Sequence, residues 1–262
     1  MKSARQALSP SPWSMKAIKD SAVDLVPEDQ SLLDWHREYI SIHSLRLAFD
    51  LDIVKMYVAR EADVLELGSI PLFFTNALSK SNYYVTGCDI APERYASSIS
   101  RLGMAVVKCD IETEKLPFGN NSFDAIIFNE IFEHLRINPI FTLSEVLRVM
   151  KPKALLVLSS PNLRSLKGII NILFKGRAHS CCGNIYAEYR KLETLGHMGH
   201  VREYTEMEVV EFLENIGFSV TEVIYRGQYE NRTGRLIVRM MPHLSPFITY
   251  LAHKPEQGAV HL

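Results

Sequence analysis

Short apolar runs alternate with helical stretches through the middle of the chain, and this alternation limits the fold more than any other feature. The runs are nearly all apolar, which is typical of strands buried on both faces of a parallel sheet. Helices that cross between such strands cover both faces of the sheet. We therefore predict an α/β fold with a doubly wound, mostly parallel, seven-stranded Rossmann-like sheet. The strands are expected at ADVLELG, YVTGCDI, MAVVKCDI, FDAIIFN, ALLVLSS, FSVTEVIYR and RLIVRMM, with helices at residues 74–79, 92–101 and 141–150.

The chain divides into four parts by its pattern. Residues 1–30 carry Ser, Pro, Lys and Asp without clear periodicity, so we expect a loosely docked arm. Residues 31–60 carry apolar side chains at steps of three and four, which predicts N-terminal cap helices that cover one edge of the sheet, with a break near residues 50–52. Residues 61–241 form the main domain, and residues 242–262 are expected to be a docked tail.

A long insertion precedes the last predicted helix. Residues 163–200 mix basic, aromatic and glycine residues and are too long for a simple connection, so we expect a lid or a substrate-binding region there. The helix after it starts with Thr205 and Glu208, which have the spacing of a capping box, and ends at Gly217.

Composition excludes several classes of partner. The 29 basic and 30 acidic residues nearly cancel, so no general electrostatic footprint for nucleic acid is present, and a small-molecule or glycan-like partner fits better. The four cysteines, Cys88, Cys109, Cys181 and Cys182, have no metal spacing and favour a reducing cytoplasm. No apolar run is long enough for a signal peptide or a membrane span. The oligomeric state stays open.

Acidic residues stand where the first two predicted strands end. The first strand ends at Glu66 and Gly68, and the second ends at Asp89. Ligands of doubly wound sheets bind beyond the carboxyl ends of the strands. The glycine allows the backbone to approach a ligand, and a carboxylate can accept both hydroxyls of a ribose. This pattern favours a nucleoside-binding site, whereas each acid alone is as well explained as a solvated loop residue.

Several motifs in order resemble class I S-adenosylmethionine-dependent methyltransferases over roughly residues 60–230. They are VLELGS, GCDIAPE, KCDIETEKLPFGNNSFDAIIFNEIFEHL, LRVMKPKALLVLSSPN and GHVREYTEMEVVEFLENIGFSVTEV. The resemblance implies S-adenosylmethionine as cofactor. It places Glu66, Gly68 and Ser69 in the loop near the methionine portion of the cofactor.

The same resemblance assigns the remaining cofactor residues. Asp89 would hold the ribose, with Ile90 packing on the adenine. Asp110 would reach the adenine amino group, with Ile111 beside it. Backbone and side chains after the fourth strand of the domain would line the cofactor, and these are Asn129 and Glu130.

The chain departs from the family in the loop after the first strand. Family members commonly read E-L-G-S-G-P-G, and here Ile70 and Leu72 replace two glycines. A glycine reaches a positive φ easily, whereas a bulky residue does not, and both side chains could fill the space of the methionine tail. The alternative to an enzyme is therefore a methyltransferase-like binding or scaffold protein that no longer uses the cofactor.

The segment NEIFEHL allows two interpretations. Glu130, Glu133 and His134 have the spacing of neighbours on one helical turn, and with His200 they resemble the divalent-metal site of ubiquinone-pathway and small-RNA O-methyltransferases. The other interpretation is that this segment is a common family feature, with Glu130 beside the cofactor and His134 packed under the sheet.

Methyl transfer is an in-line displacement that mainly needs positioning and, for a hydroxyl acceptor, a base. His134 and His200 are the candidate bases, and Arg202 and Tyr204 are candidates for orienting the substrate. His197 lies in the same segment as His200. Similarity of GHVREYT and the insertion to methyltransferases of glycan and secondary-metabolite pathways implies a small-molecule or glycan-like acceptor, methylated at oxygen.

Overall fold

The computed structural model describes residues 3–7, 9–182, 184–195 and 199–256, which form two compact units. The N-terminal unit comprises residues 9–127 and 148–155, and the C-terminal unit comprises residues 1–8, 128–147 and 156–262. His197 lies outside the described residues. The predicted boundaries after residues 30, 60 and 241 stay predictions.

The strands form one mostly parallel sheet of eight strands, in the order β1-β7-β8-β6-β5-β2-β3-β4. The predicted α/β fold is confirmed, and the predicted number of seven strands is wrong. Strands β5 and β6 contribute residues to both units. The strands are β1 (Ser3–Ala7), β2 (Asp63–Leu67), β3 (Tyr84–Asp89), β4 (Ala105–Lys108), β5 (Phe123–Asn129), β6 (Met150–Pro161), β7 (Ser219–Arg226) and β8 (Phe247–His253).

Nine α-helices lie within the described residues, together with short 3₁₀ segments at 30–32, 92–95, 132–134 and 242–244. None of these helices is both long and apolar enough to cross a membrane. The helices are α1 (Pro12–Val23), α2 (Leu33–Tyr57), α3 (Phe73–Ser79), α4 (Ala96–Leu102), α5 (Pro139–Val149), α6 (Leu166–Lys175), α7 (Ile185–Leu195), α8 (Glu206–Ile216) and α9 (Arg232–Met240).

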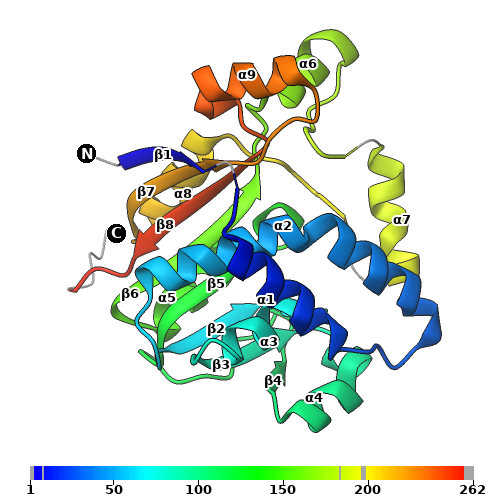
Figure 1. Ribbon diagram of the computed structural model, residues 1–262. Coiled ribbons are helices and arrows are strands. Elements are labelled where there is room, and N and C mark those ends of the chain that lie inside the picture. The colour runs from blue at the N-terminus through cyan, green and yellow to red at the C-terminus, as the bar shows by residue number, and fades with distance from the viewer. Residues whose placement is uncertain (1–2, 8, 183, 196–198, 257–262) are drawn as a thin grey trace. The chain divides into compact units, whose positions relative to one another are not determined.

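The first thirty residues contain regular elements that the sequence analysis did not predict. Strand β1 pairs parallel to β7 (Figure 1), with Ser3 opposite Glu222. Arg5 forms an ion pair with Glu222 at 2.5 Å. Its sequence, SARQA, is polar because β1 is an edge strand, so no apolar run marked it. The expectation of a loosely docked arm is therefore wrong for this segment.

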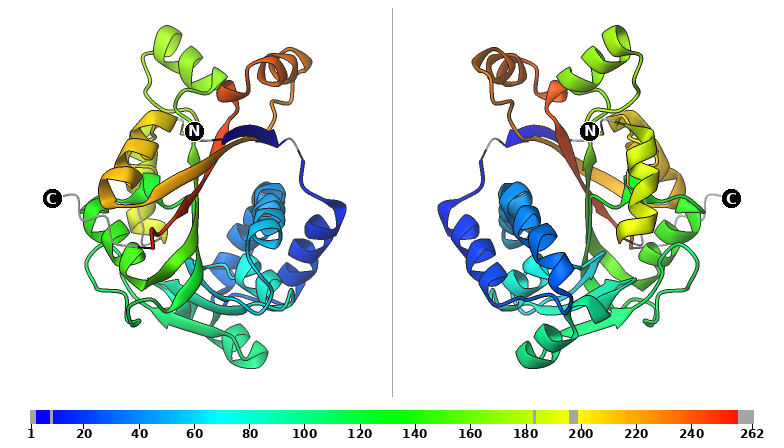
Figure 2. Two further views of the ribbon diagram at one scale, coloured as in Figure 1. Left: turned by 90° about the vertical axis from the view of Figure 1, so that its left-hand side faces the viewer. Right: turned by 90° about the vertical axis from the view of Figure 1, so that its right-hand side faces the viewer.

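Helix α1 is anchored by serine and aspartate side chains. The Ser11 hydroxyl caps the helix by accepting from the N–H of Ser14. Ser11 and Ser14 hydroxyls both donate to Asp52 of α2, at 2.7 and 2.6 Å. Helices α1 and α2 lie side by side in Figures 1 and 2, and α2 runs unbroken through Asp50, where we expected a break.

The last strand of the sheet differs from the predicted one. The run RLIVRMM is not a strand but helix α9, which starts where the Asn231 side chain accepts from the N–H of Gly234. The strand is β8, which pairs antiparallel to β7. The sequence analysis placed β8 in the tail because prolines, histidine and lysine interrupt the apolar pattern around it.

The other predicted elements are confirmed. Strands β2 to β7 form at the expected runs, and α3, α4 and α5 lie at the expected positions. Thr205 and Glu208 form the capping box of α8, and Gly217 ends this helix with a φ of 113°.

Candidate active site

The acids predicted to bind a ligand lie at the ends of three parallel strands in the N-terminal unit. Strand β2 pairs with β3 and β5, and β3 pairs with β4, all in parallel. Because parallel strands end at the same edge of a sheet, Glu66, Asp89 and Asp110 come to one edge. This is the arrangement that the sequence predicted.

Glu66 is buried beneath this edge. The Thr75 hydroxyl donates a hydrogen bond to Glu66 Oε2. Burial raises the pKa of Glu66 to about 8, and the Thr75 hydrogen bond and the Arg46 charge oppose this increase only in part. The carboxyl group is therefore mainly protonated at neutral pH in the protein alone.

The loop after β2 keeps the turn of a glycine-rich loop with different side chains. Gly68 has a φ of 65°, and its N–H donates to the carbonyl of Cys88 at 2.8 Å. Leu72 has a φ of 69°, and its N–H donates to the carbonyl of Ser69 at 2.6 Å. Leu72 thus adopts the left-handed conformation that suits glycine, at a cost of about 1–2 kcal/mol.

The two side chains that replace the glycines have different surroundings. The Leu72 side chain is completely buried, so it forms part of the apolar core. Ile70 is half-buried and is not among the described residues with a positive φ. The strain predicted for this loop therefore falls on Leu72 rather than on Ile70.

Asp89 is held in place by two backbone donors. Its Oδ2 accepts from the N–H of Ile70 at 3.0 Å, and its Oδ1 accepts from the N–H of Ala91 at 2.9 Å. These two bonds fix the orientation of the carboxylate, whose oxygens are of the type that accepts ligand hydroxyls. Ile90, next in the chain, has 47% of its surface exposed, as expected for a side chain that a planar ring could cover.

Asp110 is oriented in a similar way at the end of the next strand. Its Oδ1 accepts from the N–H of Glu112 at 3.0 Å, and its Oδ2 accepts from the Thr113 hydroxyl at 2.9 Å. Ile111 beside it is half-buried.

Two predicted cofactor residues have buried polar atoms without a hydrogen-bond partner. In the described part of the chain, neither Ser69 Oγ nor the two side-chain amide atoms of Asn129 have one. A buried polar atom that makes no hydrogen bond costs about 1–3 kcal/mol, so such atoms are usually satisfied by a ligand or water. Each residue, within its own unit, therefore offers polar atoms that a ligand or water could satisfy.

Glu130, in the C-terminal unit, forms a buried ion pair that the sequence analysis missed. Its Oε1 accepts from Arg226 Nη2 at 2.8 Å and from the Ser159 hydroxyl at 2.9 Å. Arg226 Nε donates to Thr249 Oγ1 at 2.8 Å. An arginine at the end of an apolar strand was the one signal that could have revealed this pair.

Three of the four predicted metal ligands come together. Donor atoms of Glu133, His134 and His200 lie within 4.8 Å of one another, and Glu130 is not part of this group among the described residues. The rings of His134 and His200 meet edge to face at a centroid distance of 4.9 Å. Residues 132–134 form a 3₁₀ segment after Glu130, whose φ is 54°, so the predicted sharing of one helical turn is wrong.

The two residues predicted to orient a substrate, Arg202 and Tyr204, contact each other. Arg202 forms an ion pair with Glu208 at 2.5 Å and lies over the Tyr204 ring at 4.9 Å. Tyr204 also packs on Phe132, with ring centroids 4.6 Å apart. Burial raises the pKa of Tyr204, which keeps its hydroxyl protonated at neutral pH.

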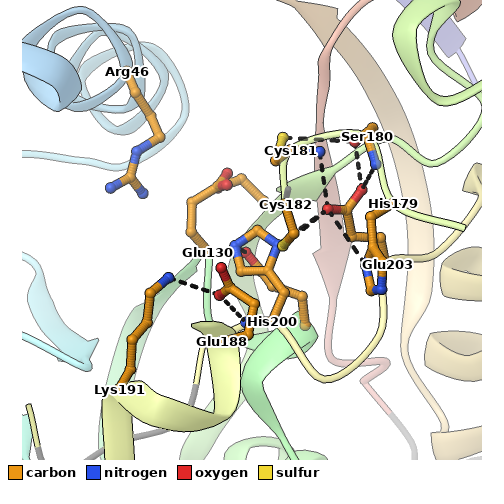
Figure 3. A network of polar contacts seen from close by, with 12 residues as sticks. Arg46, Glu130, His179, Ser180, Cys181, Cys182, Glu188, Lys191, His200 and Glu203 are labelled. Carbon is orange, nitrogen blue, oxygen red and sulfur yellow. Dashed lines mark hydrogen bonds and ion pairs between the residues drawn. The ribbon is translucent and has the colours of Figure 1, made fainter. Parts of the chain in front are cut away.

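Glu203 is the centre of a polar network that the sequence analysis did not identify (Figure 3). Its Oε2 accepts from the N–H of Ser180 at 2.5 Å and from the Ser180 hydroxyl. Its Oε1 accepts from the N–H of Cys181 at 3.0 Å and contacts His200 Nδ1 at 3.2 Å. Burial alone would raise the pKa of Glu203, but the hydrogen bonds from His200 and Ser180 outweigh it and lower the pKa to about 2.

Comparison with known proteins identifies the fold. Residues 65–158 match the family model described as a methyltransferase domain. No curated protein sequence matches the chain. The chain has a methyltransferase fold.

Solved structures agree with this methyltransferase fold over most of the chain. An S-adenosylmethionine-dependent methyltransferase from Methanosarcina mazei is 18% identical, with a TM-score of 0.56 over 78% of this chain and 98% of that one. A structure of the Haloferax volcanii Trm112 methyltransferase activator with a putative methyltransferase gives 15% identity and a TM-score of 0.59, over 88% and 99% of the two chains. The [4+2]-cyclase SpnF is 14% identical, with a TM-score of 0.54 over 96% and 98%.

The methyltransferase fold does not by itself decide the reaction. At these identities the likeness establishes the fold alone, and one of the three proteins is described as a cyclase. The segment that matches the methyltransferase domain runs from β2 into β6 and contains Glu66, Asp89 and Asp110. His200 and the Glu203 network lie outside it.

Proposed function

We propose that the protein is an S-adenosylmethionine-dependent methyltransferase. The observation that carries this proposal is Asp89, whose carboxylate is oriented by the N–H groups of Ile70 and Ala91 at the end of β3. In the methyltransferase-like arrangement this carboxylate accepts the two ribose hydroxyls of the cofactor, and exposed Ile90 packs on the adenine. Asp110 reaches the adenine amino group, with Ile111 beside it.

The cofactor supplies an electrophilic methyl group on a positively charged sulfur. Glu66, Gly68 and Ser69 support the methionine portion, and the resemblance adds Asn129 and Glu130. The residues of the chain orient the reactants for in-line displacement, and this positioning accounts for most of what such a reaction requires.

We propose a small-molecule or glycan-like acceptor that is methylated at a hydroxyl oxygen. His134 or His200 takes the hydroxyl proton as the oxygen–carbon bond forms and the carbon–sulfur bond breaks. Arg202 and Tyr204 orient the acceptor. The four free cysteines agree with action in a reducing compartment such as the cytoplasm.

The rival function is a binding or scaffold module that has lost the cofactor. The observation in its favour is the loop, where Leu72 occupies a left-handed position with a fully buried side chain and Ile70 replaces a second glycine. This function keeps the fold and predicts no response to S-adenosylmethionine.

Titration calorimetry with S-adenosylmethionine and S-adenosylhomocysteine separates the two functions. The enzyme proposal predicts saturable binding that falls at least about tenfold in Asp89→Ala, since two ribose hydrogen bonds are lost. The matched control is Asp20→Ala, which removes an exposed carboxylate that pairs only locally with Lys16. Absence of binding at millimolar ligand contradicts the enzyme proposal and favours the scaffold.

A further inference from the structure

We propose that His179, Cys182, His200 and Glu203 bind a zinc ion. All four residues belong to the C-terminal unit. The proposal does not depend on the proposed methyltransferase activity, and with His200 bound to the ion, His134 is the base of the proposed reaction. The donor set is two imidazoles, a thiolate and a carboxylate, which are the ligand types that zinc takes in proteins. Four protein ligands make a closed site, so the ion has a structural role.

The donor atoms of the other three residues converge on Glu203 Oε1. His200 Nδ1 lies 3.2 Å from this oxygen, Cys182 Sγ lies 3.6 Å from it, and His179 Nδ1 lies 4.0 Å from it. Tetrahedral zinc with bonds of about 2.0–2.3 Å keeps its ligand atoms roughly 3.3–3.8 Å apart. The three distances to Glu203 Oε1 are therefore close to the separations between ligand atoms in a tetrahedral zinc site.

His179 has an unused donor atom in this cluster. Its Nδ1 is buried and, in the part of the chain that the structure describes, makes no hydrogen bond. A buried imidazole nitrogen without a partner is unfavourable, and a metal ion would satisfy it. Together with Cys182 Sγ and a Glu203 oxygen, it lies in a group whose donor atoms are all within 4.8 Å of one another.

Neighbouring side chains orient two of the ligands, Glu203 and His200, from the side away from the proposed ion. Ser180 donates twice to Glu203 Oε2, which leaves Oε1 on the side of the other three donors. The other ring nitrogen of His200, Nε2, lies 3.9 Å from Glu133 Oε1. Histidines that bind metals commonly have a carboxylate behind the second nitrogen, where it orients the ring.

The sequence spacing fits a metal site once histidine and glutamate are considered together with cysteine. The ligands form two short pairs, H-x-x-C at residues 179–182 and H-x-x-E at residues 200–203. The sequence analysis found no metal spacing because it compared only cysteines with one another. An ion at this site joins the two ends of the segment that contains α7.

A second candidate metal site would also use His200, and it consists of Glu133, His134 and His200. The two arrangements use opposite nitrogens of His200. They differ in one decisive respect, because only the proposed site contains a sulfur ligand. A probe that reports sulfur coordination therefore distinguishes them.

The test uses the full chain, stripped of metal with a chelator and reloaded with Co²⁺ as a substitute for zinc. We expect a single ion per chain, an absorption band from thiolate-to-cobalt charge transfer, and loss of this band in Cys182→Ser. Cys181→Ser is the matched control and keeps the band, since Cys181 contacts Glu203 through its backbone N–H. His134→Ala keeps the band as well.

Three outcomes overturn the proposal. They are the absence of stoichiometric metal binding, a band that survives Cys182→Ser, and cobalt binding that lacks the band and disappears in His134→Ala. X-ray absorption at the zinc edge of the wild-type protein keeps the test valid if Cys182→Ser fails to fold. We expect one sulfur and three nitrogen or oxygen neighbours, and a first shell without sulfur contradicts the site.

Discussion

Asp89 and Ile70 join the end of β3 to the loop after β2, because the N–H of Ile70 donates to Asp89 Oδ2 at 3.0 Å. The N–H of Ala91 donates to the other oxygen, so one carboxylate fixes two segments of the predicted cofactor edge. The same residue that is proposed to bind the ribose therefore also shapes the loop in which two glycines are replaced.

Replacing Asp89 will lower stability even without cofactor. Asp89→Ala leaves the N–H groups of Ile70 and Ala91 without their acceptor, so we expect the free energy of unfolding to fall by about 1–3 kcal/mol. Asp89→Asn keeps one acceptor oxygen and should lose less. Urea unfolding of the three proteins measures the difference, and equal stability of Asp89→Ala and wild type would show that these bonds contribute nothing.

Glu66 makes stability depend on pH. Its pKa is raised from 4.5 to about 8, so between these values the folded protein holds a proton that the unfolded chain has lost. Its contribution is complete below pH 4.5 and is lost as the pH rises through about 8. A glutamine at position 66 cannot titrate, and its amide oxygen still accepts from Thr75. We therefore expect the free energy of unfolding of Glu66→Gln to fall by roughly 2–4 kcal/mol less than that of the wild type over this pH range. Unfolding from pH 5 to pH 9 tests this, and identical pH profiles for the two proteins would contradict it.

Leu72 offers a test of the left-handed loop. Both Leu72→Ala and Leu72→Gly remove a fully buried side chain, and we expect a loss of about 2–4 kcal/mol from each. Because the φ of Leu72 is 69°, glycine should be more stable than alanine here by about 1 kcal/mol. Thermal unfolding of the two variants shows which one is more stable. A more stable alanine variant would show that the loop does not hold this conformation.

The buried pair of Arg226 and Glu130 should respond strongly to loss of one partner. Their side chains are 5% and 13% exposed, so Arg226→Ala removes a guanidinium that pairs with the Glu130 carboxylate in a largely water-free environment. We expect a loss of about 3–5 kcal/mol. The double variant Arg226→Met with Glu130→Gln should recover much of this loss. If chemical denaturation finds the double variant less stable than Arg226→Ala, loss of the ion pair is not the source of the destabilisation.

The sequence predicted the centre of the sheet better than its margins. Strands β2, β5 and β6 are largely buried and therefore apolar, so their pattern is visible in the sequence alone. Edge strand β1 is polar and has no such pattern. Helix α9 was mistaken for a strand because its run of Leu236, Ile237 and Val238 is short and apolar, which periodicity cannot distinguish from a strand.

The residues of the candidate site likewise include some that the sequence predicted and some that it did not. Glu66, Asp89 and Asp110 were predictable because each lies within two residues of the end of its own strand. The pair of Glu130 and Arg226 joins residues 96 positions apart, and the bond of Glu203 to Ser180 spans 23 positions. Contacts of this kind depend on how the elements pack, and local patterns in one sequence contain no information on them.

The pairing of β1 with β7 has a consequence for how the chain is made. Arg5 and Glu222 lie 217 positions apart, so residues 3–7 leave the ribosome long before the strand that they accompany exists. Residues 3–7 can therefore pair with β7 only after the strands between them in the sequence have been synthesised and the middle of the sheet has had time to form.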